Sequence, residues 1–200
     1  MQKVVQQARK AFRTRGGILR TTEALAAGIH PRTLYAMRDS GELAVLSHGI
    51  FRLGSLPPMA NPDLTTVAMR VPHGVICLTS ALAFHELTTQ IPHDVHLAIA
   101  RTSRPPRMKF PPLHVYRFSR EAFEPGIEVH TIDRVGIRIY SAEKTLADCF
   151  KYRNKIGMDV FLEALRAYRR RSKPQFQKVL ENAGICRVAR LIRPYLEALV

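Results

Sequence analysis

A short helix predicted to begin at Pro31 carries side chains that could read the edges of DNA bases. The side chains expected on or near its open face include Arg32, Thr33, Tyr35 and Arg38. Arginine can donate two hydrogen bonds to guanine, threonine can contact a thymine methyl group, and tyrosine can reach a phosphate or a base edge. The alternative is a small core helix whose arginines are only solvated. The charge of the chain and the neighbouring elements favour contact with DNA.

Four residues close to this helix in the sequence are further candidates for DNA contact. His30 precedes the helix and could bind a phosphate from its N-terminus, or could serve only as a cap. Ser47, His48 and Arg52 belong to a predicted hairpin, where they could contact phosphates or the minor groove. Ordinary turn residues are an equally good interpretation of these three.

Two basic segments lie far from the predicted reading helix. A proline-rich loop over 101–112 contains Arg101, Arg104, Arg107 and Lys109. Prolines keep such a loop extended, so its cations could follow a phosphate backbone, and binding of this kind weakens steeply with salt. A run that includes Arg169, Arg170 and Arg171 ends a predicted helix. Cations at a helix C-terminus also stabilise the helix dipole, so this run could serve stability alone.

The histidines and cysteines do not form a recognisable metal site. His73, Cys77, His85, His93 and His96 lie within 24 residues, but no pair has the spacing of a structural zinc finger. A buried or hydrogen-bonded structural role is the simpler interpretation of these side chains. We therefore predict no metal and no cofactor.

The acidic residues give weak support for an enzyme. A magnesium-dependent nuclease gathers acids and a lysine around its metal, and the nearest material here is Asp63, Asp133 and Glu143. Lys144 is adjacent to Glu143, so the two side chains diverge, and Lys144 with Asp148 is most simply an ion pair within one helix. Phosphate-binding glycine loops, Gly-x-Ser-x-Gly and His-Glu-x-x-His are all missing from the sequence. We predict no catalytic residues.

The charge of the chain favours a polyanionic partner. The 200 residues contain 31 Lys and Arg against 16 Asp and Glu, a formal net charge of +15. Residues 1–58 carry nine cations against three acids, and the last fifty residues carry twelve against four. No apolar run approaches the roughly 18 residues of a membrane span. The three cysteines are isolated and odd in number, which favours reduced thiols and a cytoplasmic protein.

The first 58 residues predict a winged helix-turn-helix domain. A helix over 2–14 precedes a short extended piece at Ile18, and a second helix follows, with Thr21 or Thr22 as its N-cap. Gly28 marks a tight turn before the helix at Pro31, and a C′ glycine, Gly41, ends that helix. Two strands over 43–46 and 50–53 form the predicted hairpin.

Residues 59–200 predict a mixed α/β domain that ends in helices, which makes the whole chain α+β. Residues 75–78 are a strand or the entry to a helix at about 80–88. The other expected strands cover 95–100, 113–118, 127–132 and 135–140, and the other expected helices cover 61–71, 142–152, 158–171, 174–183 and 186–199.

Two sequence blocks in this second domain resemble the AbiEi family. Residues 74–88 (GVICLTSALAFHELT), with Ile91-Pro92-His93 after them, resemble the start of the family's C-terminal domain. Residues 140–153 (YSAEKTLADCFKYR), with Glu163-Ala164-Leu165 after them, are also similar to it. The resemblance extends over nearly the whole chain. These proteins look like antitoxins and transcriptional repressors of bacterial abortive-infection operons, which are type IV toxin–antitoxin systems.

The resemblance implies a function for each domain. The N-terminal winged helix would bind inverted repeats in its own promoter, with base reading by Arg32, Thr33, Tyr35 and Arg38. The C-terminal domain would assist repression and carry the antitoxic activity, for which no single residue can be assigned. The implied partner is a nucleotidyltransferase-like toxin that is neutralised without a stable complex. A magnesium-dependent nucleic-acid-processing enzyme and a basic protein that binds an acidic partner remain the alternatives.

Overall fold

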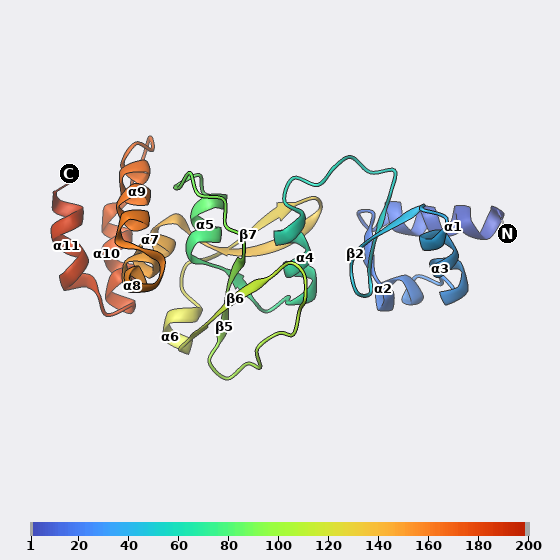
Figure 1. The fold of residues 1–200 in the computed structure, drawn as a ribbon, viewed down its shortest axis with the longest axis horizontal. Coiled ribbons are helices and arrows are strands. Elements are labelled where there is room, and N and C mark those ends of the chain that lie inside the picture. Colours follow the sequence, from blue (N-terminus) through green and yellow to red (C-terminus); the bar gives the residue numbers. More distant parts are fainter. Residues whose placement is uncertain (1, 199–200) are drawn as a thin grey trace. The chain divides into compact units, whose positions relative to one another are not determined.

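The computed structural model describes residues 2–198 and divides into two units (Figure 1). Unit 1 contains the residues up to Met69 together with Thr131–Val135, and unit 2 contains Arg70–His130 and the rest of the chain from Gly136. The predicted boundary after residue 58 falls in the loop between β3 and α4, whereas the structure groups nearly all of α4 with unit 1.

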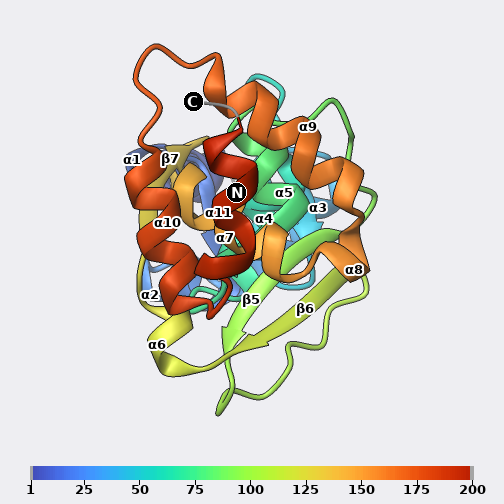
Figure 2. The ribbon, with the colours of Figure 1, turned by 90° about the vertical axis from the view of Figure 1, so that its left-hand side faces the viewer.

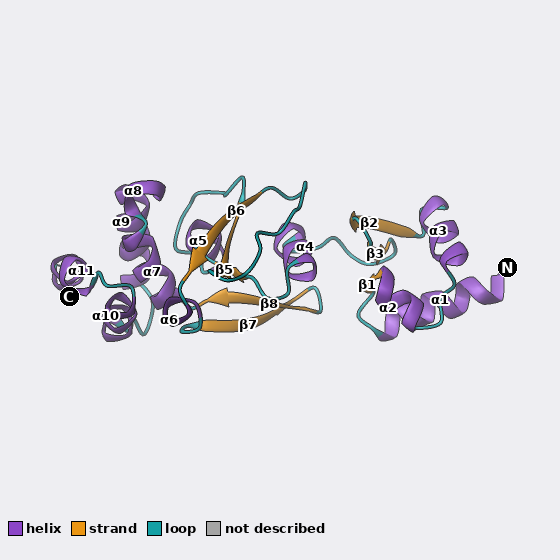
Figure 3. Cartoon of the chain, turned by 90° about the horizontal axis from the view of Figure 1, so that it is seen from below, coloured by secondary structure: helices purple, strands orange, loops and turns teal. Residues whose placement is uncertain are grey.

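Unit 1 has the elements of a winged helix-turn-helix, as predicted (Figures 1 and 3). Its strands form a three-stranded antiparallel sheet in the order β1-β3-β2. The elements are α1 (Gln2–Thr14), β1 (Ile18–Arg20), α2 (Thr21–Ala26), α3 (Pro31–Asp39), β2 (Leu43–Ser47), β3 (Ile50–Leu53) and α4 (Pro62–Arg70).

Local interactions fix the two helices of the helix-turn-helix. Gly28 and Gly41 have φ angles of +81° and +76°, which glycine adopts at little cost. The side chain of His30 caps α3, because its Nδ1 accepts the backbone N–H of Arg32 at 3.2 Å. The prediction of Thr21 or Thr22 as the N-cap of α2 is wrong. Arg20 is the N-cap, and its N–H donates to the Glu23 carboxylate at 2.7 Å.

The core of unit 1 lies between the three helices and the small sheet. It is formed by Ala8, Phe12, Leu19, Ala24, Ile29, Leu34, Met37, Leu43, Phe51 and Leu53. Val4 of α1 is 49% exposed, because the packed side of the helix passes through Ala8 and Phe12. The buried face of α3 consists of Leu34 and Met37.

Unit 2 is a five-stranded mixed sheet with a group of helices (Figures 1 and 3). The strand order is β6-β5-β4-β8-β7, with β5 parallel to β6, and β4 antiparallel to β5 but parallel to β8. Its strands are β4 (Val75–Ile76), β5 (Val95–Ala100), β6 (Leu113–Phe118), β7 (Ile127–Ile132) and β8 (Val135–Tyr140). Its helices are α5 (Leu78–Phe84), α6 (Arg120–Phe123), α7 (Ala142–Lys151), α8 (Arg153–Ile156), α9 (Met158–Arg169), α10 (Phe176–Ile185) and α11 (Ala189–Glu197).

The elements of unit 2 agree with the predicted α/β domain that ends in helices. Residues 75–78 were predicted as a strand or as the entry to a helix, and the segment contains both, since β4 ends at Ile76 and α5 begins at Leu78. Two helices of four residues, α6 and α8, were not predicted, because one turn is too short to show a helical period. Among residues 2–198, no helix has both the length and the apolar composition needed to cross a bilayer.

A buried ion pair lies at the centre of the helical part of unit 2. The ammonium group of Lys144 donates to both carboxylate oxygens of Asp148, at 2.7 and 2.6 Å, and both side chains are almost completely buried. The thiol of Cys186, which follows α10, donates to the same carboxylate at 3.1 Å. The Lys144 ammonium also lies 4.5 Å from the ring centroid of Tyr140. These contacts join α7 to α10 and to the sheet (Figure 2).

Removing one partner of this pair is expected to destabilise the protein strongly. In Asp148→Ala the ammonium group of Lys144 stays buried without its counter-charge, which costs about 3–5 kcal/mol of the free energy of unfolding. Urea denaturation followed by circular dichroism measures this loss. Glu197→Ala is the control, because it breaks an exposed Arg193 pair of 3.7 Å and should cost less than about 1 kcal/mol. Similar losses in the two variants would contradict the structural role of the buried pair.

A partly buried histidine on the sheet of unit 2 is held in its neutral form. Thr79 Oγ1 lies 3.1 Å from Nδ1 of His96, and the His114 ring centroid lies 5.2 Å from that of His96. Burial, and then the positive charge of His114, lower the pKa of His96 from 6.5 to about 4, although Asp94 acts in the opposite direction. Protonation of His96 is therefore less favourable in the folded protein than in the unfolded chain.

This pKa shift predicts a loss of stability in mild acid. The contribution of His96 is complete above pH 6.5, its pKa in the unfolded chain, and is lost as the pH falls toward 4. Glutamine does not titrate, so in His96→Gln the fall in unfolding free energy between pH 6.5 and 4 should be smaller than in wild type. We expect a difference of about 1–2 kcal/mol, which is less than the full pKa shift implies because solvent partly reaches the ring. Urea denaturation at several pH values measures this difference. His73→Gln, at an exposed site, is the control and should follow wild type. An unchanged pH profile in His96→Gln would refute the prediction.

Candidate nucleic-acid interface

The outer face of α3 presents three of the four predicted reading residues to solvent. Arg32, Tyr35 and Arg38 are exposed, and Tyr35 has 42% of its surface accessible. Leu34 and Met37 are buried in the core of unit 1, so the helix cannot rotate about its axis without losing this packing. The face that carries Arg32 and Tyr35 is thereby fixed outward.

Tyr35 and Arg38 are held in place by neighbouring side chains. The Tyr35 ring meets the ring of Phe51 on β3 edge-on, with centroids 6.4 Å apart and an angle of 77° between the planes. The guanidinium carbon of Arg38 lies 4.9 Å from the Tyr35 ring centroid, and Arg38 also pairs with Asp39 at 2.7 Å. The charge of Arg38 is therefore partly compensated within unit 1. The side chain of Arg32 makes no hydrogen bond or ion pair with the residues that the structure describes.

Thr33 lies on the side of α3 that adjoins α1. It is half-buried and lines a pocket of about 240 Å³ with Val4, Gln7, Ala27 and other residues of α1 and of the turn after α2. The sequence placed Thr33 on or near the open face of α3. The structure locates it at the edge of that face, next to the outer surface of α1.

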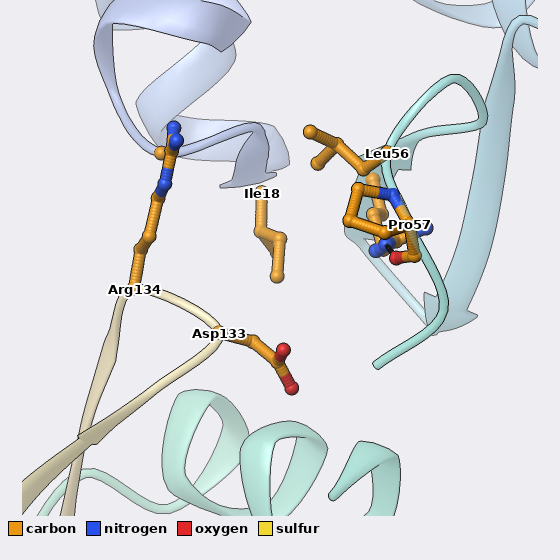
Figure 4. Close-up of a pocket in the computed structure, with 7 residues that line it drawn as sticks. Ile18, Leu56, Pro57, Asp133 and Arg134 are labelled. Atoms are coloured by element: carbon orange, nitrogen blue, oxygen red, sulfur yellow. Dashed lines mark hydrogen bonds between the residues drawn. The ribbon is translucent and has the colours of Figure 1, made fainter. Parts of the chain in front are cut away.

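The wing residues have different surroundings. His48 is exposed at the turn between β2 and β3, beside Gly49 with its φ angle of +72°. Arg52 is directed instead toward the loop after β3, where its guanidinium group donates to the backbone oxygens of Pro57 and Leu53. It lines a second pocket of about 110 Å³ in unit 1 (Figure 4). Arg52 therefore has structural partners that a hairpin pattern does not reveal.

The cations of residues 1–58 fall into two groups. Four of the nine have a partner: Arg9 pairs with Glu42 at 2.7 Å, Arg20 donates to the Met69 carbonyl, and Arg38 and Arg52 are described above. The other five make no side-chain hydrogen bond or ion pair within the described part of the chain, and they are Lys3, Lys10, Arg13, Arg15 and Arg32. The four that lie outside α3 were not predicted as DNA contacts, although residues 2–20 contain no acid.

The basic residues predicted in unit 2 are exposed, with one of them anchored. Arg101, Arg104, Arg107 and Lys109 are all exposed along the loop between β5 and β6. Arg169 and Arg170 are exposed at the end of α9. Arg171 is also exposed, but it donates to the backbone oxygen of His85 at 2.7 Å and so satisfies a carbonyl at the end of α5.

The acids and the lysine considered for catalysis do not converge. Glu143 accepts a hydrogen bond from the Tyr168 hydroxyl at 2.6 Å, while Lys144 is buried against Asp148. Across the described residues 2–198, no three His, Cys, Asp or Glu side chains are grouped in a way that could hold a metal ion. The exposed face of α3 offers cations and one oriented aromatic ring.

Comparison with known proteins agrees with this description. Residues 6–54 match the model of a family described as transcriptional regulators with AbiEi antitoxin activity. The fold is similar to the crystal structure of the RV2827C protein from Mycobacterium tuberculosis, with a TM-score of 0.51 and 13% sequence identity over 96% of this chain and 78% of that one. At this identity the likeness concerns the fold alone. No curated protein matches the chain.

Proposed function

We propose that this chain, whose residues 6–54 match the model of the AbiEi antitoxin family of transcriptional regulators, represses its own operon by binding inverted repeats in the promoter. The family supports a DNA-binding, regulatory antitoxin role for the chain. The observation that carries the proposal is the outer face of α3 in a winged unit. An uncompensated arginine, Arg32, and an oriented ring, Tyr35, stand there side by side with no function in the core.

In the proposed complex, α3 enters the major groove and reads bases directly. Arg32 would donate two hydrogen bonds to a guanine, and Tyr35 would contact a base edge or a phosphate. His30 and Thr33 lie at the first turn of α3, and His48 would approach the backbone from the wing. Arg38 keeps Tyr35 in place and contributes less charge of its own, since it pairs with Asp39.

The antitoxic part of the proposal concerns unit 2. The toxin partner is a nucleotidyltransferase-like protein of a type IV system, which is neutralised without a stable complex. The exposed cations Arg101, Arg104, Arg107, Lys109, Arg169 and Arg170 would add sequence-independent grip on nucleic acid. Arg171 would contribute mainly through its bond to the end of α5.

Binding of promoter DNA by single-residue variants tests this proposal. Arg32→Ala and Tyr35→Ala should each weaken binding to a promoter duplex containing the inverted repeats by about 5- to 100-fold, because each removes a base contact worth about 1–3 kcal/mol. Fluorescence anisotropy with the promoter duplex and a scrambled duplex measures the change. The loss should be confined to the promoter duplex, where base contacts are made.

The control is Arg190→Ala, which removes an exposed arginine of α11 and should bind the promoter duplex within about twofold of wild type. Circular dichroism checks that each variant is folded. If Arg32→Ala and Tyr35→Ala both bind the promoter duplex like wild type, α3 is not the reading helix. If wild type itself does not prefer the promoter duplex to the scrambled one, the protein is not a repressor of that promoter.

A further inference from the structure

The uncompensated charge of the winged unit lies mainly on α1 rather than on the reading helix. Of the five cations in residues 1–58 without a partner among the described residues, α3 holds only Arg32. Lys3, Lys10 and Arg13 belong to α1, and Arg15 follows it directly. Most of the unpaired cations of residues 1–58 therefore lie on or next to α1. The winged-helix pattern alone does not predict that this helix contacts DNA.

Three of these cations form a row on the outer surface of α1. Lys3, Lys10 and Arg13 are separated by seven and three residues, a spacing that places side chains on one side of a helix. All three are exposed, and the buried side chains of the same helix, Ala8 and Phe12, lie away from the row. Gln6 and Gln7 fill the turn between Lys3 and Lys10 with polar side chains that can also bind phosphate oxygens.

The row does not serve the stability of α1. Lys3 lies in the first turn, where the helix dipole disfavours a cation, and the helix has no acid in that turn. Lys10 and Arg13 are like charges three residues apart, which repel each other slightly. Arg9, in contrast, has its own partner in Glu42, and this pair fixes α1 to the start of β2. Arg13 lies in the last turn and suits the helix dipole, so Lys3 and Lys10 are the cations of the row that gain most when a polyanion neutralises them.

The side of α1 next to Lys3 and Lys10 adjoins the edge of the outer face of α3. Gln7, which lies beside these two cations on the helix, and Val4 line the same 240 Å³ pocket as Thr33. A duplex that admits α3 into its major groove therefore carries its flanking phosphates toward this side of α1. In helix-turn-helix proteins the helix that precedes the recognition helix crosses the backbone; that helix is α2 here, so a contact by α1 is additional to it.

We propose that α1 is a second DNA contact of unit 1, in which Lys3, Lys10 and Arg13 bind backbone phosphates beside the groove that α3 enters. This inference rests on the proposed binding of duplex DNA by α3. It assigns different tasks to the two helices: Arg32 and Tyr35 on α3 discriminate between sequences, and α1 supplies affinity that is independent of sequence. The ligand atoms are phosphate oxygens of a duplex.

The salt dependence of binding separates these two tasks. A cation that neutralises a duplex phosphate adds about 0.9 to the slope of log K against log salt concentration. The triple variant Lys3→Gln/Lys10→Gln/Arg13→Gln should therefore lower the magnitude of the slope by about 2–3, and Lys10→Gln alone by about 0.9. Affinity for the promoter duplex and for a scrambled duplex should fall by the same factor, so their ratio stays as in wild type.

Arg9→Gln is the matched control for Lys10→Gln. It removes one charge from the adjacent position of the same helix, but that charge is already paired with Glu42, so the slope should stay within about 0.3 of wild type. Circular dichroism verifies that the variants are folded.

An unchanged slope in the triple variant overturns the inference, as does a loss confined to the promoter duplex. If the triple variant keeps the wild-type slope but loses binding to polyglutamate, α1 binds an acidic protein surface and the inference is also wrong. Failure of the proposed function gives a different result. In that case wild type does not prefer the promoter duplex to the scrambled one, but the salt slopes of wild type and the triple variant can still be compared.

Discussion

The packing of Leu34 and Met37 into the core of unit 1 is the constraint on which the candidate interface depends. These two side chains set the rotation of α3 about its axis, and this rotation directs Arg32 and Tyr35 outward. It also turns Thr33 toward α1 and brings Tyr35 against Phe51 on β3. A change in the apolar core would therefore alter the proposed base contacts on the opposite side of the helix. The orientation of the proposed reading face depends on the buried residues of α3 as well as on the exposed ones.

The chain uses its charges in two contrasting ways. In unit 2, Lys144 and Asp148 are buried together, and the carboxylate also accepts the Cys186 thiol, so the cluster joins the helices but is closed to any partner. In unit 1, several cations face solvent with no partner in the described part of the chain. Only the second kind can bind a polyanion, because its charge is not compensated. The net charge of +15 therefore includes cations that attract no polyanion because they are already paired. It also does not show which elements of the chain would contact a polyanion.

Local signals predicted all the elements except the two one-turn helices α6 and α8, but they did not predict interactions between residues that are distant in the sequence. Gly28, Pro31 and Gly41 marked the helix-turn-helix because turn and cap geometry depends on near neighbours. The cap of α2 was misplaced because Thr21 and Thr22 resemble good N-caps, whereas the Glu23 carboxylate binds the N–H of Arg20. The partners of Arg52 and Arg171 could not be predicted, because both are backbone oxygens and every residue type has one. Lys144 and Asp148 were recognised as a pair, but the helical spacing that identified them does not reveal that they are buried.

The clamp around Tyr35 has a consequence for how binding evolves and how fast it occurs. Because Phe51 and Arg38 already orient the ring, Tyr35 would lose little rotational freedom in the proposed complex, and less entropy would oppose association. An aromatic side chain that is oriented in advance also needs no slow rearrangement after the first encounter. In that complex, substitutions of buried residues that support Tyr35 would shift sequence preference while the proposed contact residues stay the same.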